Sequence, residues 1–290
     1  MQQSGSACEF TNSDSWVILS PIEQSIKRKI ESVGTPLKDW DINIYRGVLT
    51  GYNEAFIIST EKRNEILDNC ATEEERQRTA ELIRPILRGR DIKRYGYNWA
   101  NLWLINTHNG IKGKLERIHI EDYPAVKAHL DQYWDKISKR ADKGETPYNL
   151  RNCAYLEDFN KPKIVYPNMT KYMPFVYDEN NFLTNQKCFI VTGVHMAYLT
   201  AFFNSSIFKF CFRDSFPELQ GGTRELSKIF FDKIPVLEIT DEINEEFRDV
   251  VNKLQAIYAK EDAIKIDSML SDLYNLTASE REYIGYIEIS

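Results

Sequence analysis

Residues 188–210 read CFIVTGVHMAYLTAFFNSSIFKF, and this stretch decides the fold class. Its first part, Cys188–Thr192, is rich in β-branched and aromatic residues, which predicts a strand. The run from Ala197 to Phe210 is almost entirely apolar, so we expect a helix that is buried on all sides. A strand that leads into a buried helix indicates an α/β protein with a sizeable core.

Segments on both sides of this stretch extend the pattern. Further strands are predicted at 55–59, 102–106, 163–166 and 175–177. Helices are predicted at 21–33, behind the capping box Ser20–Glu23, after Thr72–Glu75 until Pro85 interrupts, and at 123–141. We therefore predict an α/β (mixed α+β) fold, with a mixed-sheet body over residues 1–237.

The composition changes after Pro235. Ile243, Phe247, Val250, Leu254 and Ile257 recur with alternating spacings of four and three residues, which predicts a heptad seam on an acidic helix. Thr277–Glu280 is a capping box that begins a last short helix. We place a boundary near 237 and expect residues 238–290 to form a helical tail for docking or dimerisation.

The net charge of −6 over 290 residues does not by itself indicate a nucleic-acid partner. It is unevenly distributed, because residues 238–290 contain 13 acids and 5 bases, a net charge of −8, which leaves +2 for residues 1–237. Bases gather in three parts of the body, where aromatic residues such as Tyr95, Tyr148 and Tyr172 are interleaved. Lysine and arginine bind phosphates, and aromatic rings contact sugars and bases, so this pattern favours a nucleic-acid contact over a merely solvated face.

Several classes of protein are excluded. No apolar run approaches the roughly 18 residues of a membrane helix, and Met1–Phe10 lacks the features of a signal peptide. The five cysteines, Cys8 among them, are scattered without a C-x-x-C pair, so we expect reduced cysteines rather than a disulfide framework or a zinc site. We expect a cytoplasmic protein with no membrane partner.

No complete catalytic site can be found in the sequence. There is no P-loop, no G-x-G-x-x-G and no G-x-S-x-G, and the four histidines have no metal-ligand spacing. Asp91-Ile-Lys93 is a fragment of a nuclease pattern, but no Pro-Asp precedes it. His195 is interpreted as a cap or core residue of the following helix. We therefore expect no enzymatic activity in this chain.

Six segments resemble the TaqI-like C-terminal specificity domain of type IIG restriction–modification enzymes and related adenine methyltransferases. They occur in the family's order and together extend the resemblance from about residue 10 to the end. The segments are Tyr45–Ile58, Ile83–Tyr95, Arg140–Arg151, Phe159–Pro167, Gly221–Leu226 with Lys233–Pro235, and Ile266–Thr277. Residues 97–135 match least well.

The resemblance implies a role in site-specific DNA recognition. In that family a methyltransferase domain upstream carries S-adenosylmethionine and an Asn/Asp-Pro-Pro-Tyr/Phe motif, and this chain has no Pro-Pro. We therefore expect no cofactor here, and double-stranded DNA and a methyltransferase domain or subunit as partners. The domain is expected to clamp the duplex, read base edges and permit flipping of the target adenine, whose amino group is inaccessible inside the stack. The parent enzyme is expected to be an N6-adenine methyltransferase, with or without an endonuclease.

The candidate DNA-binding residues are polar or basic and lie in the matching segments or beside them. Gly89 is expected to let the backbone approach a phosphate, and the hydroxyl and guanidinium that follow two glycines suit a phosphate or guanine. The full set is Thr50, Asn53, Arg88, Arg90, Lys93, Arg94, Lys161, Lys163, Asn168, Thr223, Arg224 and Lys228.

Structural alternatives stay open for parts of this set. Arg90 and Asp91 can pair within a loop, the Gly221–Arg224 segment can be a structural turn, and Thr50–Asn53 can be a turn without a ligand. An alternative for the whole chain is a protein–protein scaffold, or a separate specificity subunit, that acts through the acidic heptad helix.

Overall fold

The computed structural model describes residues 19–288, so Cys8 and the Met1–Phe10 segment lie outside the described residues. The helices are α1 (Pro21–Val33), α2 (Asn53–Phe56), α3 (Thr60–Asp68), α4 (Glu73–Leu82), α5 (Pro124–Asp131), α6 (Trp134–Ile137), α7 (Met196–Asn204), α8 (Ser206–Phe212), α9 (Lys228–Phe231), α10 (Asp241–Ala256), α11 (Lys260–Leu273) and α12 (Ala278–Ile284). None of the helices in this part of the chain has both the length and the apolar character needed to cross a bilayer.

Two four-stranded sheets form the centre of the molecule. One is antiparallel, in the order β10 (Val176–Asp178), β8 (Lys163–Pro167), β12 (Cys188–Gly193), β2 (Ile42–Arg46). The other is mixed, in the order β11 (Leu183–Thr184), β4 (Ile83–Leu87), β7 (Leu102–Ile105), β3 (Ile57–Ser59). The expected α/β fold is confirmed.

Three two-stranded pairs complete the strands. They are β1 (Gly34–Pro36) with β14 (Pro235–Leu237), β5 (Ile92–Lys93) with β6 (Gly96–Tyr97), and β9 (Met169–Thr170) with β13 (Arg224–Glu225). The last two pairs lie in connections between longer elements, where they fix the loops that form the site described below.

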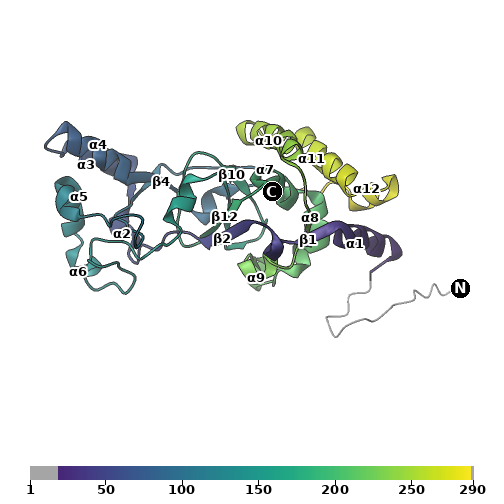
Figure 1. Ribbon diagram of the computed structural model, residues 1–290, viewed down its shortest axis with the longest axis horizontal. Helices are drawn as coiled ribbons and strands as arrows, with labels where there is room; N and C mark the ends of the chain where they lie inside the picture. The colour runs from purple at the N-terminus through teal and green to yellow at the C-terminus, as the bar shows by residue number, and fades with distance from the viewer. Residues whose placement is uncertain (1–18, 289–290) are drawn as a thin grey trace, which may run out of the picture.

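The antiparallel sheet has a hydrophobic core on each face. On β12 and β8, alternate residues such as Val191 and Ile164 belong to one core and Ile190 and Val165 to the other, as the two-residue period of a strand requires. Figure 1 shows α3–α6 gathered at one end of the elongated molecule and α7, α8 and α10–α12 at the other, with the sheet strands between them. All five residues of β8 are buried, because both of its faces are covered.

The sequence located most elements but missed two breaks. Helix α1 covers Pro21–Val33 with the expected capping box, and α12 begins behind the expected Thr277–Glu280 box. The expected helix at 197–210 is two helices, since Ser205 interrupts it and its hydroxyl accepts from Phe208 N as the cap of α8. The expected helix at 123–141 also divides, into α5 and α6.

The helical tail shares its core with the body. Phe247, Val250 and Leu254 of α10 are buried in the same hydrophobic cluster as Ile26 of α1 and Tyr198 of α7. Residue 237 therefore does not separate two cores in the described chain. Helix α7 covers these three residues of the seam, whereas Ile257, at the end of the seam, is exposed. Docking or dimerisation through the tail stays a prediction.

Candidate nucleic-acid interface

An open cleft of about 930 Å³ lies where three connections meet. The turn between β4 and β5, with β5 itself, contributes 88–90 and 92–94. The end of β8 and the connection after it contribute 167–170, Tyr172 and Pro174, and the turn before β12 contributes Asn185 and Lys187. Asn53, at the start of α2, completes the wall. Of the expected DNA-binding residues, the cleft brings together Asn53, Arg88, Arg90, Lys93, Arg94 and Asn168.

Three cations of the cleft are exposed and carry uncompensated charge. Arg90, Lys93 and Lys187 have no carboxylate within ion-pairing distance among residues 19–288. An arginine and two lysines on the walls of one concave surface create a positive potential that attracts anions. The shape of the cleft concentrates this potential inside it. Lys187 was missed in the sequence, because an isolated lysine in a short turn carries no pattern.

Arg88 lies in the same wall but is already paired. Its Nη2 donates to Asp91 Oδ1 at 2.8 Å and its Nε to Asp91 Oδ2 at 3.0 Å, and its backbone N–H donates to the same carboxylate. The hydrogen bonds to Asp91 raise the pKa of Arg88 above its usual value. The alternative in which Arg90 pairs with Asp91 was wrong, because Arg88 occupies that carboxylate and leaves Arg90 free.

Arg94 is turned inward from the cleft. Its Nη2 donates to the carbonyl of Asn204 at 2.7 Å and its Nη1 to the hydroxyl of Tyr286 at 2.8 Å, and only 9% of the residue is exposed. Its guanidinium therefore ties the cleft wall to α7 and to the end of the chain. The expected DNA contact of Arg94 is corrected to this internal role.

Gly89 has a packing role. A Cβ at this position would lie 3.2 Å from Cβ of Pro167 and 3.3 Å from the carbonyl of Lys187. The missing side chain thus lets the turn approach neighbouring protein segments, and because Gly89 also lines the cleft, the expected approach of a phosphate to its backbone stays a prediction.

Lys161 and Lys163 diverge although they are two residues apart. Lys163 is fully buried in β8, with Nζ 2.6 Å from Asp178 Oδ2 and 2.8 Å from the carbonyl of Phe159. Burial lowers its pKa, while Asp178 acts in the opposite direction. Lys161 is exposed, pairs with Asp158 at 2.7 Å and does not line the cleft. The expected DNA contact of Lys163 was wrong, since an inaccessible ammonium cannot reach a ligand.

Arg224 is also satisfied within the chain. It donates to the carbonyl of Phe216 at 2.7 Å and to the carboxylates of Asp214 and Glu218 at 2.9 Å each, and its side chain is 8% exposed. The expected base or phosphate contact of Arg224 is therefore corrected to a structural one. Thr223 beside it is half-buried, and Lys228 is exposed but pairs with Asp232 at 2.7 Å.

The Thr50–Asn53 segment is a structural turn. Thr50 is buried, its hydroxyl donates to Oδ1 of Asn53 at 2.5 Å, and its carbonyl accepts from Arg140. Arg140 belongs to the second basic stretch of the sequence; burial lowers its pKa to about 10, and its guanidinium is used on backbone carbonyls. Of this turn only Asn53 reaches the cleft.

Polar and aromatic groups accompany the cations. Asn168, Thr170 and Asn185 supply amide and hydroxyl groups to the wall, and the ring of Tyr172 is 46% exposed there. Thr170 and Asn185 were missed, whereas Tyr172 was noted among the interleaved aromatics without being assigned to the site. Amides, hydroxyls, cations and an aromatic face are the groups with which proteins contact phosphates and bases.

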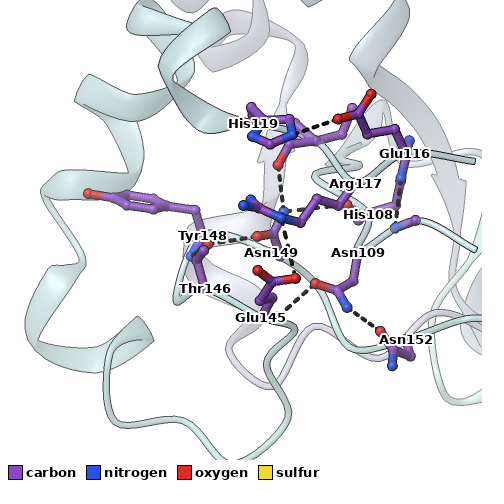
Figure 2. A network of polar contacts seen from close by, with 12 residues as sticks. His108, Asn109, Glu116, Arg117, His119, Glu145, Thr146, Tyr148, Asn149 and Asn152 are labelled. Carbon is purple, nitrogen blue, oxygen red and sulfur yellow. Dashed lines mark hydrogen bonds and ion pairs between the residues drawn. The ribbon is translucent and has the colours of Figure 1, made fainter. Parts of the chain in front are cut away.

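A second polar cluster is formed by residues 108–119, which lie in the range that matches the family least well, and by residues 145–152. Figure 2 shows residues of this cluster that bind one another: Asn109 Oδ1 accepts from the backbone N–H of Glu145 at 2.6 Å, and His119 Nε2 lies 3.1 Å from Glu116 Oε1. Asn149 Nδ2 also donates to the carbonyl of Ile118 at 2.8 Å. These amides are occupied in holding two loops together. The cluster therefore fixes a surface loop.

Among the described residues, no group of three or more histidine, cysteine, aspartate or glutamate side chains could hold a metal ion. The cysteines at 70, 153, 188 and 211 are free thiols.

The fold of this chain is similar to parts of known restriction enzymes. The chain is similar in structure to the type IIG restriction endonuclease BpuSI, with a TM-score of 0.53 and 16% identity over 88% of this chain and 33% of that one. It is also similar to the type IIL restriction–modification enzyme MmeI, solved in complex with DNA, with a TM-score of 0.56 and 10% identity over 83% of this chain and 34% of that one. The chain thus spans about a third of the length of these two proteins, and at such identities the likeness concerns the fold. No curated protein matches the chain significantly.

The family model of the TaqI-like C-terminal specificity domain matches residues 84–236. The match runs from the strand that precedes the cleft to β14, and so includes nearly all of the cleft wall. It agrees with the resemblance carried by the sequence motifs, and the chain belongs to the TaqI-like C-terminal specificity domain family.

Proposed function

We propose that this chain is the DNA target-recognition domain of a type IIG restriction–modification enzyme, and that it binds double-stranded DNA with the cleft. The observation that carries the proposal is the set of three uncompensated cations, Arg90, Lys93 and Lys187, on the walls of one open cleft. Phosphates held there would displace counterions, which is the main source of affinity in protein–DNA binding.

In this proposal, the uncharged polar groups between these cations recognise the DNA bases. Asn168 carries an amide that can donate and accept at once, as a bidentate contact with adenine requires, whereas Oδ1 of Asn53 already accepts from Thr50 and Oδ1 of Asn185 from the backbone N–H of Lys187. Phosphate contacts set the register of the protein on the duplex, and contacts to base edges set the sequence.

Catalysis and cofactor binding belong, in this proposal, to a methyltransferase domain or subunit outside the chain. S-adenosylmethionine and the target adenine would be bound there, and an N6-adenine methyltransferase, with or without an endonuclease, would be the parent enzyme. The similarity to BpuSI and MmeI, of which the chain spans about a third, supports this division of labour.

The scaffold alternative has less support. It required a free apolar seam on the acidic helix, and most of that seam is packed against α7 within the chain's own core. The exposed surface of the tail, including the acidic side of α10, remains for a partner.

The test is binding of the 290-residue chain to duplex DNA over a range of salt concentrations. A negative slope of log affinity against log salt is expected, and selection from a pool of random duplexes should enrich one short sequence. Salt-independent binding, or a slope without any enriched sequence, would contradict sequence recognition through the cleft.

A further inference from the structure

A short hairpin rises beside the cleft and carries an exposed apolar side chain at its tip. In residues 218–224, the backbone N–H of Leu219 donates to the carbonyl of Thr223 at 2.6 Å. The backbones of Glu218 and Arg224 form an antiparallel β-bridge. Strand β13 then pairs with β9, so that Arg224 faces Thr170 and Glu225 faces Met169. Because Met169 and Thr170 line the cleft, the hairpin adjoins its edge.

Three large apolar side chains are exposed on the two segments that this strand pairing joins, and two of them, Met169 and Tyr172, line the cleft. Leu219 on the hairpin is 39% exposed, Met169 52% and Tyr172 46%. We call these three residues the apolar rim. The tip beyond Leu219 is narrow, since Gly221 and Gly222 both have φ of +76° and no heavy atom lies within 4 Å of where their Cβ atoms would be. Apolar groups gathered next to a charged cleft mark a contact surface.

A buried basic side chain forms hydrogen bonds to each of the two segments that carry the rim. Arg224 joins the base of the hairpin to Phe216, Asp214 and Glu218 through the hydrogen bonds given above. Lys209 is buried, and its Nζ donates to the carbonyls of Met173 and Phe203.

The Lys209 contact is unusual because this ammonium has no carboxylate partner among the described residues, and desolvation lowers its pKa well below the usual value. It holds Met173, whose φ of +50° is rare for a residue with a side chain, directly after Tyr172. The two hydrogen bonds of Lys209 thus connect the segment that presents Met169 and Tyr172 to α7 and α8.

We propose that the apolar rim is a wedge that enters the base stack of duplex DNA held in the cleft. Leucine, methionine and aromatic side chains that enter between base pairs unstack them partially and kink the duplex. Phosphates on either side of the unstacked step would lie against Arg90, Lys93 and Lys187, which share the cleft with Met169 and Tyr172. The inference rests on the proposed function, because the wedge needs a bound duplex.

The experiment compares two kinds of variant on one duplex. The rim variant carries Met169→Ala, Tyr172→Ala and Leu219→Ala, and the cation variant carries Lys93→Ala. Ile257→Ala is the matched apolar control, because Ile257 is 79% exposed at the end of α10 and does not line the cleft. The probe is the sequence enriched from the random pool or, without enrichment, a mixed-sequence duplex at low salt.

Two readouts separate the contributions. Permanganate oxidises thymines that have lost their stacking, so it reports unstacking directly, and the salt slope reports phosphate contacts. We expect the unmodified chain to make at least one thymine hyperreactive and the rim variant to abolish this. The rim variant should also bind roughly 5- to 150-fold more weakly for each side chain that stacks on a base, with an unchanged slope. Lys93→Ala should retain the hyperreactive thymine and lower the slope by about 1.

The outcomes distinguish the two proposals. Failure of the unmodified chain to bind DNA in a salt-dependent way would contradict the proposed function. Salt-dependent binding without a rim-dependent hyperreactive thymine would overturn the wedge alone. If the rim variant instead fails to bind a methyltransferase partner while DNA affinity and thymine reactivity stay unchanged, the rim is a protein interface and the wedge is wrong. Far-UV circular dichroism of each variant verifies that it is folded.

Discussion

The guanidinium of Arg88 and the carboxylate of Asp91 form a bidentate pair, with the two contacts at 2.8 and 3.0 Å. The side chain of Asp91 is 5% exposed, whereas that of Arg88 is 20% exposed. The pair closes the turn between β4 and β5 and uses the only acid in the 84–94 basic stretch. Arg90 and Lys93 are consequently left without a partner, and the charge that remains for a ligand points into the cleft.

Arg88 and Arg90 should respond differently to substitution. Arg88→Ala leaves a buried carboxylate without its partner and should lower the free energy of unfolding by about 1–3 kcal/mol. Arg90→Ala should leave stability within about 0.5 kcal/mol and lower the salt slope of DNA binding by about 1. Urea unfolding and salt-dependent binding of both variants measure the contrast, and equal effects on stability would refute it.

The buried Lys163–Asp178 pair gives a test of stability. Lys163→Met leaves Asp178 as an uncompensated buried charge, so we expect a loss of about 3–5 kcal/mol in the free energy of unfolding. Lys161→Met is the control, because it breaks an exposed pair worth about 0–1 kcal/mol. Urea titrations of both variants report the difference. A small loss for Lys163→Met would mean that the ammonium is accessible to water.

Glu280 links the last helix to the first and should make stability depend on pH. Burial opposes its ionisation, but hydrogen bonds from Lys29, Thr277 and Ser25 outweigh this and lower its pKa from 4.5 to about 2. Because the folded-state pKa is the lower one, the carboxylate stabilises the fold above pH 4.5, and this stabilisation disappears as the pH falls towards 2.

We expect Glu280→Gln to remove up to about 3 kcal/mol at neutral pH and to flatten the stability curve in that acidic window. Unfolding measured from neutral to acidic pH checks the sign. Glu282→Gln, on the exposed side of α12, is the matched control. Identical acid profiles for the two variants would contradict the role of Glu280.

The seam of α10 should act within one chain. Phe247 is 1% exposed and packs edge-to-face on Tyr198, with ring centroids 5.2 Å apart, so Phe247→Ala should cost about 3–5 kcal/mol. The unfolding midpoint should not depend on protein concentration, since the seam is covered by α7. A midpoint that rises with concentration would favour the dimerisation that the heptad spacing suggested.

Much of the fold followed from local pattern. The capping boxes at Ser20 and Thr277, the heptad spacing on α10 and the β-branched run at Cys188 each locate an element, because the signal lies in neighbouring residues. The breaks at Ser205 and after Asp131 were missed, because a hydrophobic stripe continues across a helix interruption.

The candidate site was harder to read from sequence. A cation within a basic stretch looks the same whether it faces a phosphate or a carbonyl, and Arg90 and Arg94 are the example: one is exposed in the cleft and the other bonds to Asn204 and Tyr286. Lys187 lines the same cleft as Lys93, although the two residues are more than ninety positions apart in the sequence.

By itself, the sequence determined the fold class, the family and the basic segment 88–94 that lines the cleft, since secondary structure and motifs are recorded in the order and spacing of nearby residues. Only the tertiary structure decided which cations are free. Whether Lys163 meets Asp178, Arg94 turns to Asn204 or Lys93 meets no acid depends on contacts between separate segments of the chain. The physical reason is that an ion pair acts over a few ångströms of space, and folding sets those distances without regard to separation along the chain.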